Sequence, residues 1–470
     1  MKHYNSLKKI QQDLKLNKIT CLELVNGYLS NVAKHKDLNA FIETYDVEAQ
    51  EKAIIIDDKI KNNKAGKLAG LVIGVKDNIC YKNHSSTAAS KILKGYNSPY
   101  SATVVERLIR EDAIILGRLN CDEFAMGSTN KNSIYGPVAN PINKEYVPGG
   151  SSGGSAAAVK ANLCHAALGT DTGGSIRQPS AFCGVYGLKP TYGLVSRHGL
   201  IAYASSFDQI GPITKSVDDI DKILDVISGK DDFDGTCVGN ITLRKNYQES
   251  SKPTKFAIPK EVVDFKEINI EIKTHFSNLL DKIVSKGHTV EYINLPLLDY
   301  LVPAYYILTT AEASSNLARY DGIKYGYREG KDNLEELIKN TRTNGFGREV
   351  KRRILLGTFV LSQGYYDAYY IKAQKIRHLI KKQTEEILKT YDYMLLPTSP
   401  NLPFKINEDK SPTKLYNEDI FTVQSNLSGH PSLSIPLSLT KDKFFSSAQL
   451  IGNYFSEREM LDVANNIITN

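Results

Sequence analysis

The stretch VPGGSSGGSAAAVKANLCHAALGTDTGGSIRQPSAFCGVYG, residues 147–187, is rich in glycine and hydroxyl side chains and carries few charges. It contains two Gly-Gly-Ser turns, which end at Ser151 and Ser175. Clustered glycines favour loops that need unusual backbone angles or a close approach to a ligand. Residues 155–160 predict the start of a helix, and residues 164–168 predict a short buried strand. The pattern therefore predicts that two backbone turns deliver two serines to one place.

Composition places the chain among globular proteins with a sizeable core. Its 470 residues are 41% hydrophobic and 24% charged, which is ordinary for such proteins. The net charge of +7 is spread along the chain. It weakly favours an anionic partner, but a lysine-rich solvated surface is the better explanation.

Cysteine and histidine usage argues against a disulfide framework and against a metal site. None of the six cysteines forms a Cys-x-x-Cys pair, which predicts free thiols in a reducing compartment. The nine histidines show no metal-binding spacing, so we expect no metal. No apolar run is long enough to span a membrane, and the N-terminus is polar and amphipathic. We therefore expect no membrane partner and a cytoplasmic location, or an organelle matrix.

Strands alternate with helices along the whole chain. This alternation predicts an α/β fold with a large mixed twisted sheet covered by helices on both faces. A polar stretch at 230–253 predicts a surface loop. We interpret 295–390 as a helical insertion that covers one end of the sheet, where the active site would lie. Hydrophobic spacing predicts helices at 4–35, 47–61, 101–111, 217–228, 268–286, 303–342, 349–390 and 456–469, and strands at 71–75, 113–116, 255–258, 288–293, 393–396 and 432–436.

Three residues are candidates for chemistry. Lys76 closes the predicted strand 71–75, where open sheets place ligand-facing side chains, although a surface lysine is the plainer reading. Ser151 alone fits a turn and Ser175 alone fits a helix N-cap. A serine nucleophile needs a base, and His165 lies between apolar residues. A lysine can act as that base if burial keeps it neutral. Glycines before Ser175 also offer open N–H groups for an oxyanion.

These segments together resemble a known family. The runs GGSSGGSAAAV (149–159) and GTDTGGSIRQPSAFCGVYGLKPTYGLVS (169–196), with LVIGVKDNI (71–79), are similar to the signature of the amidase signature family. The likeness is strong over 65–230, the signature core, and looser to the end of the chain. It implies the amidase signature fold and a single amidase domain over 1–470.

The resemblance implies a catalytic triad. Ser175 would be the nucleophile that forms the acyl intermediate. Ser151 would be the bridging serine, held by a cis peptide bond after Gly150, and Lys76 would be the neutral base at the end of the proton relay. Backbone N–H groups would form the oxyanion hole, contributed by Thr172, Gly173, Gly174 and Ser175.

Other segments resemble the branch of this family that takes ammonia from glutamine for tRNA-dependent amidotransferases. They are LNCDEFAMGSTNKNS, GLIAYASSFDQIGP, EASSNLARYDGIKYGYR and FGREVKRRILLGTFVLSQGYYDAYY. The resemblance implies that Arg353 binds the glutamine carboxylate, Asp419 its ammonium, and Tyr305 lines the pocket. Without the resemblance, Arg353 would be a charge on a helix surface. Glu418 adjoins Asp419 and leaves that assignment open.

The same likeness implies partners for the chain. A small C subunit and a B subunit would complete a heterotrimer, in which the B subunit binds ATP, with Mg²⁺, and the mischarged Glu-tRNA(Gln). The product would be Gln-tRNA(Gln), and this chain itself would need no cofactor. The alternative is a stand-alone amidase that acts on another small amide with the same triad.

Three rival motifs have weaker support. Residues 149–153 fit the G-x-S-x-G elbow, but no strand directly precedes them and Ser175 stays unexplained. Residues 128–131 fit S-x-x-K, but no later K-T-G or S-D-N accompanies it. The glycine loops could bind phosphate, but the chain has no G-x-x-x-x-G-K-[ST]. Two departures from the family pattern are the 441–452 segment, which lacks the Pro and Gly that usually precede the strand there, and His430, where a small or aliphatic residue is usual.

Overall fold

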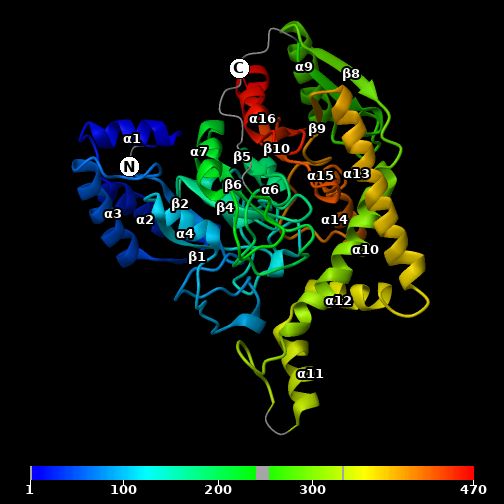
Figure 1. Cartoon of the computed structure of the whole chain (residues 1–470), viewed down its shortest axis with the longest axis horizontal. Helices are drawn as coiled ribbons and strands as arrows, with labels where there is room; N and C mark the ends of the chain where they lie inside the picture. Colours follow the sequence, from blue (N-terminus) through cyan, green and yellow to red (C-terminus); the bar gives the residue numbers. More distant parts are fainter. Residues whose placement is uncertain (1–2, 240–252, 331–332, 470) are drawn as a thin grey trace.

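One mixed sheet organises the protein (Figure 1). The computed structural model describes residues 3–239, 253–330 and 333–469, and within them the sheet has 11 strands. In sheet order the strands are β1 (Phe41–Thr44), β3 (Ile114–Leu119), β2 (Val72–Lys76), β4 (Ala166–Asp171), β6 (Gln209–Thr214), β5 (Tyr186–Lys189), β10 (Ser432–Leu439), β11 (Phe445–Ile451), β9 (Tyr393–Pro397), β7 (Lys255–Pro259) and β8 (Thr289–Ile293).

Strand direction decides where functional residues meet. β3, β2 and β4 run parallel near one end of the sheet, where β1 adds an antiparallel edge strand, and β9, β7 and β8 run parallel at the other end. The strands between them pair antiparallel. Lys76 is the last residue of β2, and Asp171 is the last residue of its parallel neighbour β4. Carboxyl ends of adjacent parallel strands lie at one edge, so the loop after Asp171 leaves beside Lys76.

Helices surround this sheet on either side of it (Figure 1). None of the helices in the described residues is both long enough and apolar enough to cross a membrane. The helices are α1 (Leu7–Lys15), α2 (Cys21–Lys34), α3 (Asp46–Lys61), α4 (Thr103–Arg110), α5 (Gly153–Lys160), α6 (Arg177–Cys183), α7 (Val217–Ile227), α8 (Lys260–Val263), α9 (Ile270–Ser285), α10 (Leu298–Asn316), α11 (Leu334–Gly345), α12 (Arg348–Val360), α13 (Lys372–Thr390), α14 (Pro412–Asn417), α15 (Val423–Ser428) and α16 (Glu457–Val463).

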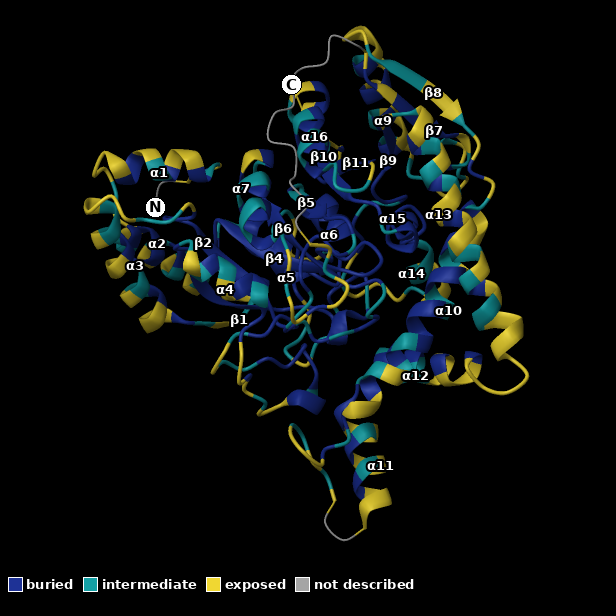
Figure 2. Cartoon of the chain, viewed as in Figure 1, coloured by how far each residue is buried: buried dark blue, intermediate teal, exposed yellow. Residues whose placement is uncertain are grey.

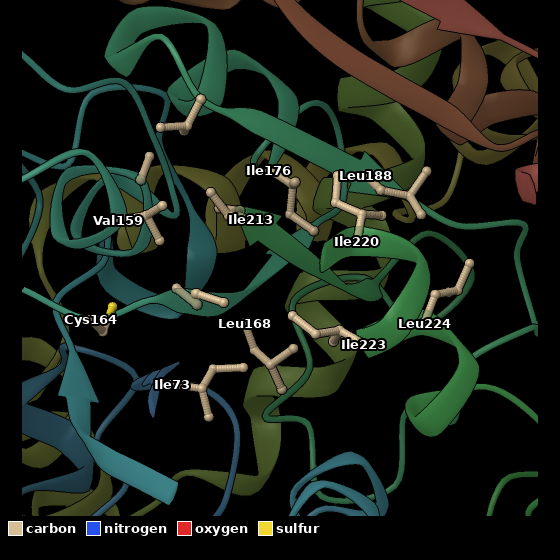
Figure 3. Close-up of a cluster of buried hydrophobic side chains, with 14 of the residues drawn as sticks. Ile73, Val159, Cys164, Leu168, Ile176, Leu188, Ile213, Ile220, Ile223 and Leu224 are labelled. Atoms are coloured by element: carbon tan, nitrogen blue, oxygen red, sulfur yellow. The ribbon is translucent and has the colours of Figure 1, made fainter. Parts of the chain in front are cut away.

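The core lies between the sheet and its helices. Figure 2 shows the central strands as buried and the outer helices as buried on one side only. In α7, Ile220, Ile223 and Leu224 recur at helical spacing and face side chains of β4 and β6 (Figure 3). Each such fully buried side chain contributes about 1.5–3 kcal/mol to stability. This packing fixes β4, and with it the start of the serine loop.

The helix α5 is buried on all sides because it consists of small residues. Its first seven residues, GGSAAAV, have little or no exposed surface. A Cβ on Gly154 would lie 2.3 Å from the Asn120 carbonyl oxygen, so the backbone approach needs glycine there. The run of small residues therefore places the N-terminus of this helix, and the serines before it, deep inside the protein.

Sequence-based predictions of the regular elements are confirmed in part. The predicted helices at 47–61, 101–111 and 217–228 agree with α3, α4 and α7 within two residues. The predicted strand 164–168 was wrong in its bounds: β4 runs from Ala166 to Asp171. Four strands, β1, β5, β6 and β11, were not predicted. Residues 240–252 of the predicted surface loop lie outside the described residues.

Three long predicted helices were wrong in their continuity. The segment 4–35 forms α1 and α2, because the capping box at Thr20 and Glu23 starts a new helix. The segment 303–342 divides into α10 and α11, and 349–390 divides into α12 and α13. Gly364, with φ of +86°, lies in the break between the last two. The layout of 295–390 as an insertion stays a prediction.

Candidate active site

The amine of Lys76 is enclosed by hydroxyl groups. The side chain is fully buried at the end of β2. Its Nζ lies 2.8 Å from Ser151 Oγ, 2.9 Å from Ser152 Oγ and 2.7 Å from Thr170 Oγ1. Burial lowers the pKa of this lysine to about 8, because the charged form loses its hydration. A neutral amine is thus accessible near physiological pH.

The hydroxyl oxygens of Ser152 and Thr170 are arranged to accept hydrogen bonds from the Lys76 amine. Ser152 donates its own proton to the Thr170 carbonyl oxygen at 3.1 Å, so its oxygen is an acceptor for Lys76. Thr170 Oγ1 also accepts from Asn78 Nδ2 at 3.1 Å. A neutral amine has two N–H groups and one lone pair, and these two acceptors satisfy both N–H groups. The lone pair is left for the Ser151 hydroxyl, which suits proton removal from Ser151.

The peptide bond between Gly150 and Ser151 is cis, in agreement with the geometry that the resemblance implies. Gly150 N–H donates to Gln178 Oε1 at 2.9 Å, which anchors this loop to α6. The second serine loop lies beside the first: Ser152 N–H donates to the Ser175 carbonyl oxygen at 3.1 Å. The structure therefore brings Lys76, Ser151 and Ser175 into one region.

A buried ion pair shapes the Ser175 loop. Asp171 and Arg177 form two hydrogen bonds of 3.0 Å, through Arg177 Nε and Nη2. Asp171 Oδ1 also accepts from the Gly174 N–H at 2.8 Å, and Oδ2 from the Ile176 N–H at 3.1 Å. Burial alone would raise the pKa of Asp171, but Arg177 and the other donors lower it below its usual value. The carboxylate thus stays charged and holds the loop around itself.

The two glycines of this loop are needed because side chains pack directly on them. A Cβ on Gly173 would lie 2.4 Å from the Tyr305 hydroxyl oxygen, and one on Gly174 would lie 2.3 Å from Thr422 Oγ1. Thr422 Oγ1 also donates to the Gly173 carbonyl oxygen at 2.6 Å. Tyr305 on α10 therefore contacts the loop that carries Ser175.

The N–H groups of this loop are not equivalent. Within the described part of the chain, those of Thr172, Gly173 and Ser175 have no protein acceptor. The Gly174 N–H, which the resemblance assigns to the oxyanion hole, is bonded to Asp171 here. The oxyanion-hole role of this N–H stays a prediction, and it requires the N–H to exchange its bond with Asp171 for one with the oxyanion.

Ser175 is available to a ligand. Its side chain retains 8% of its surface exposed, whereas Ser151 has none. No hydrogen bond from Ser175 Oγ to another protein group is formed among the described residues. Ser175 Oγ is therefore not hydrogen-bonded to Ser151 among the described residues.

Arg353 lies in an aromatic box rather than on a helix surface. Its guanidinium carbon lies 5.4, 5.2 and 5.5 Å from the ring centroids of Tyr203, Tyr306 and Tyr416. Nε donates to Glu349 Oε1 at 2.9 Å and Nη1 to the Tyr203 hydroxyl at 2.8 Å. These contacts hold the guanidinium rigidly, which suits capture of a carboxylate.

Asp419 lies at the hydroxyl end of Tyr306. The Tyr306 hydroxyl donates to Asp419 Oδ2 at 2.8 Å, while its ring contacts Arg353. Burial raises the pKa of Asp419 to about 7. Glu418, the competing residue in the sequence, binds Lys410 at 3.2 Å and Asn401 instead. The structure thus brings opposite charges of Arg353 and Asp419 to one tyrosine.

An open pocket borders this region. It has a volume of about 410 Å³ and includes Arg353, Glu349, Tyr416 and Ser128 in its lining. Ser128 carries the carbonyl oxygen that accepts from Gln178, the residue that anchors the Ser151 loop. The pocket therefore gives solvent access next to the aromatic box.

Several site residues were not predicted from the sequence. Ser152 adjoins Ser151 and Tyr306 adjoins Tyr305, so neighbours of predicted residues were the available signal. Glu349 precedes Arg353 by four residues, a spacing typical of a helical ion pair. Thr170 and Thr422 had no signal of their own, because their roles depend on the tertiary fold.

Comparison with known proteins supplies a family likeness. Residues 23–461 match the family model described as Amidase. The chain is 45% identical to the A subunit of the glutamyl-tRNA(Gln) amidotransferase of Chlorobium phaeobacteroides, over 98% of each protein. It is 47% identical to the corresponding A subunit from Halothermothrix orenii, over 92% of this chain and 93% of the relative.

Solved structures agree. The crystal structure of the glutamyl-tRNA(Gln) amidotransferase A subunit from Thermotoga maritima has a TM-score of 0.79 at 38% identity, covering 97% of this chain and 96% of its own. Native peptide amidase from Stenotrophomonas maltophilia has a TM-score of 0.82 at 25% identity, covering 98% and 95%. Both the large mixed sheet and its helices are thus shared with these proteins.

The hydroxyl shell of Lys76 makes a first prediction. Thr170→Val keeps the shape but removes an acceptor 2.7 Å from Nζ. An unpaired buried donor costs about 1–3 kcal/mol, so acylation of Ser175 by a small serine-directed reagent should slow by roughly five- to 150-fold. Thr170→Ser should restore most of the rate. Equal rates in the wild type and the valine variant would show that this hydroxyl does not orient the lysine.

The lowered pKa of Lys76 makes a second prediction. Lys76 is a base only when neutral, and with a pKa of about 8 roughly a tenth of the molecules carry the neutral amine at pH 7. Acylation of Ser175 should therefore speed up from pH 7 to 9 and level off above that. The measurement is the labelling rate against pH for the wild type and Lys76→Ala. A rise that persists unchanged in the alanine variant would rule out Lys76 as the titrating group.

Proposed function

The chain belongs to the amidase family, and from this premise we propose that it is the glutamine-hydrolysing subunit of a glutamyl-tRNA(Gln) amidotransferase. It releases ammonia from glutamine for the conversion of Glu-tRNA(Gln) to Gln-tRNA(Gln). The observation that carries the proposal is that Arg353 contacts the ring of Tyr306 and Asp419 accepts from its hydroxyl, while the adjacent Tyr305 packs on the Ser175 loop. A free amino acid presents one carboxylate and one ammonium, and these two residues offer the matching charges.

The proposed chemistry begins at Ser175. Its Oγ attacks the side-chain amide carbon of glutamine, and its proton passes through Ser151 to neutral Lys76. The developing oxyanion would accept hydrogen bonds from the free N–H groups of the 172–175 loop. When the tetrahedral intermediate collapses, the relay returns the proton to the leaving nitrogen and ammonia departs. Water then attacks the acyl group through the same relay and releases glutamate.

Substrate recognition would use charge and rigidity together. Arg353 would bind the α-carboxylate, with a guanidinium already fixed by Glu349 and Tyr203. Asp419 would bind the α-ammonium, and the bound cation would favour the carboxylate form of a group whose pKa burial raises to about 7. Tyr305 would form the wall between the substrate and the Gly173 backbone.

We propose that ammonia release is coupled to partner subunits. A B subunit would bind ATP, with Mg²⁺, and Glu-tRNA(Gln), and a small C subunit would complete the heterotrimer. The names of the relatives, which are subunits of an amidotransferase, support this proposal. In it the described chain needs no cofactor for its own reaction.

Ser175→Ala tests the nucleophile. The variant loses one oxygen at a loop position, so it should fold and assemble normally but hydrolyse no glutamine. With ammonium chloride supplied, the complex should still amidate Glu-tRNA(Gln), because the nucleophile only delivers ammonia. The two assays are glutamate release and tRNA amidation. Glutaminase activity in the variant would remove Ser175 from the mechanism, and loss of both activities would point to a folding defect.

Asp419→Asn and Arg353→Gln test the substrate pocket, and Glu418→Gln is the matched control. Leaving one charge of a buried pair without its partner costs about 2–5 kcal/mol, which corresponds to roughly thirty-fold or more in kcat/KM for glutamine. Labelling of Ser175 by an uncharged acylating reagent should be unchanged in all three variants. Normal glutamine kinetics in both pocket variants would leave a serine amidase with another substrate.

A further inference from the structure

The outer face of α12 and the turn after it is apolar and uncovered. Among the described residues, 355–369 contain a single charged side chain, Asp367. Figure 2 shows the outer end of α12 and its connection to α13 as exposed. We call this surface the 355–369 patch. Its members are Leu355 (70% exposed), Leu356 (40%), Phe359 (44%), Leu361 (37%), Tyr365 (43%), Tyr366 (41%) and Tyr369 (41%).

The patch is an ordered surface. Gly357, on the inner side of α12, packs so closely on α10 that a Cβ would lie 2.0 Å from the Thr310 carbonyl oxygen. On the outer side the Phe359 ring lies 4.3 Å from the Tyr365 ring and 6.0 Å from the Tyr369 ring, measured between centroids. Leu355 and Phe359 are four residues apart and share one helix face. The aromatic cluster is therefore already arranged, and binding to it would cost little side-chain entropy.

The exposed area is large for a surface with no function. Aromatic side chains have about 150–250 Å² each, so four rings at about two-fifths exposure present roughly 250–400 Å² before the leucines are added. The largest apolar patch on a typical monomer covers about 300–600 Å² and is often functional, and a typical interface buries about 800 Å² on each partner. Tyrosine and phenylalanine are also enriched at interface centres, where charges are depleted.

Charge around the patch indicates the kind of partner. Basic residues flank it on both sides: Arg348, Lys351 and Arg352 precede it, and Lys372 and Lys375 follow it. A second copy related by a two-fold axis would bring like charges together, which is unfavourable. A different protein with an apolar centre and an acidic rim would complement both features.

We propose that the 355–369 patch is the surface on which the complex of the B and C subunits docks. That complex would contact the patch through an apolar surface with an acidic rim. This inference rests on the proposed function. The first part of the patch, Leu355 to Phe359, lies on the same helix as Arg353, which is buried on the side that faces the substrate pocket. The partner thus binds the back of the helix that holds the pocket arginine.

The test measures binding of the full chain to a co-purified complex of the B and C subunits. Leu355→Glu/Phe359→Glu should raise Kd at least about thirtyfold, which equals a loss of about 2 kcal/mol of binding free energy and is typical of losing one central interface residue. The matched control is Ile270→Glu, a substitution at a 72% exposed apolar residue on α9; its Kd should stay within about threefold of the wild type. Labelling of Ser175 in every variant verifies the fold of the chain.

The outcomes are separable. If the wild type does not bind the B–C complex, the proposed function fails. If the wild type and the double variant bind equally, only the docking surface is overturned. Two further arms test other occupants: sedimentation of the free chain, and its co-sedimentation with vesicles of phosphatidylserine and phosphatidylcholine. Self-association or vesicle binding that the double variant abolishes, with B–C binding retained, would assign the patch to a second copy or to a lipid surface instead.

Discussion

The Asp171–Arg177 ion pair is the interaction on which the site geometry depends. Arg177 is fully buried, and beyond Asp171 it binds the Thr422 carbonyl oxygen, Gln449 and Asn426. One side chain thus joins the end of β4, the start of α6, the α15 region and β11. Removing one member of a buried pair leaves a charge without compensation and costs several kcal/mol. The loop between the two residues carries Ser175, so its position depends on this pair.

The second constraint is the absence of carboxylates from the direct contacts of Lys76. Its amine touches only hydroxyls in the described structure. A direct aspartate would favour the ammonium form and remove the base. The site therefore separates two tasks. The charged pair of Asp171 and Arg177 fixes the shape of the Ser175 loop, while the uncharged surroundings of Lys76 favour the neutral form of its amine.

Sequence patterns predicted those helices, strands and turns whose conformation is determined by residues close to them in the sequence. The strand that ends at Lys76, the small-residue helix α5 and the two serine turns all have signals within a few residues. Short antiparallel strands such as β5 and β6 were missed, because their stability comes from partners distant in the sequence. The breaks after Val360 and Asn316 were missed because hydrophobic spacing continues through them.

The same distinction holds for the site. The residues of the suggested triad were found because each sits in a recognisable motif. The orienting hydroxyl of Thr170 and the enclosing rings of Tyr203 and Tyr416 were not, since only the fold brings them to Lys76 and Arg353. A polar side chain in an ordinary strand or helix gives no sign of which buried group it will meet.

The aromatic box around Arg353 has a consequence for the length of the substrate. Three rings and Glu349 leave the guanidinium little freedom, and Asp171 leaves the Ser175 loop little freedom. If Arg353 holds the α-carboxylate of an amino acid and Ser175 attacks its side-chain amide, the distance between these two residues fixes the length of the substrate. Asparagine, one methylene shorter, would hold its amide short of Ser175, and such a difference is typically worth about 1–3 kcal/mol. Selectivity for glutamine would then come from stiffness on both sides of the substrate rather than from any contact with the methylene itself.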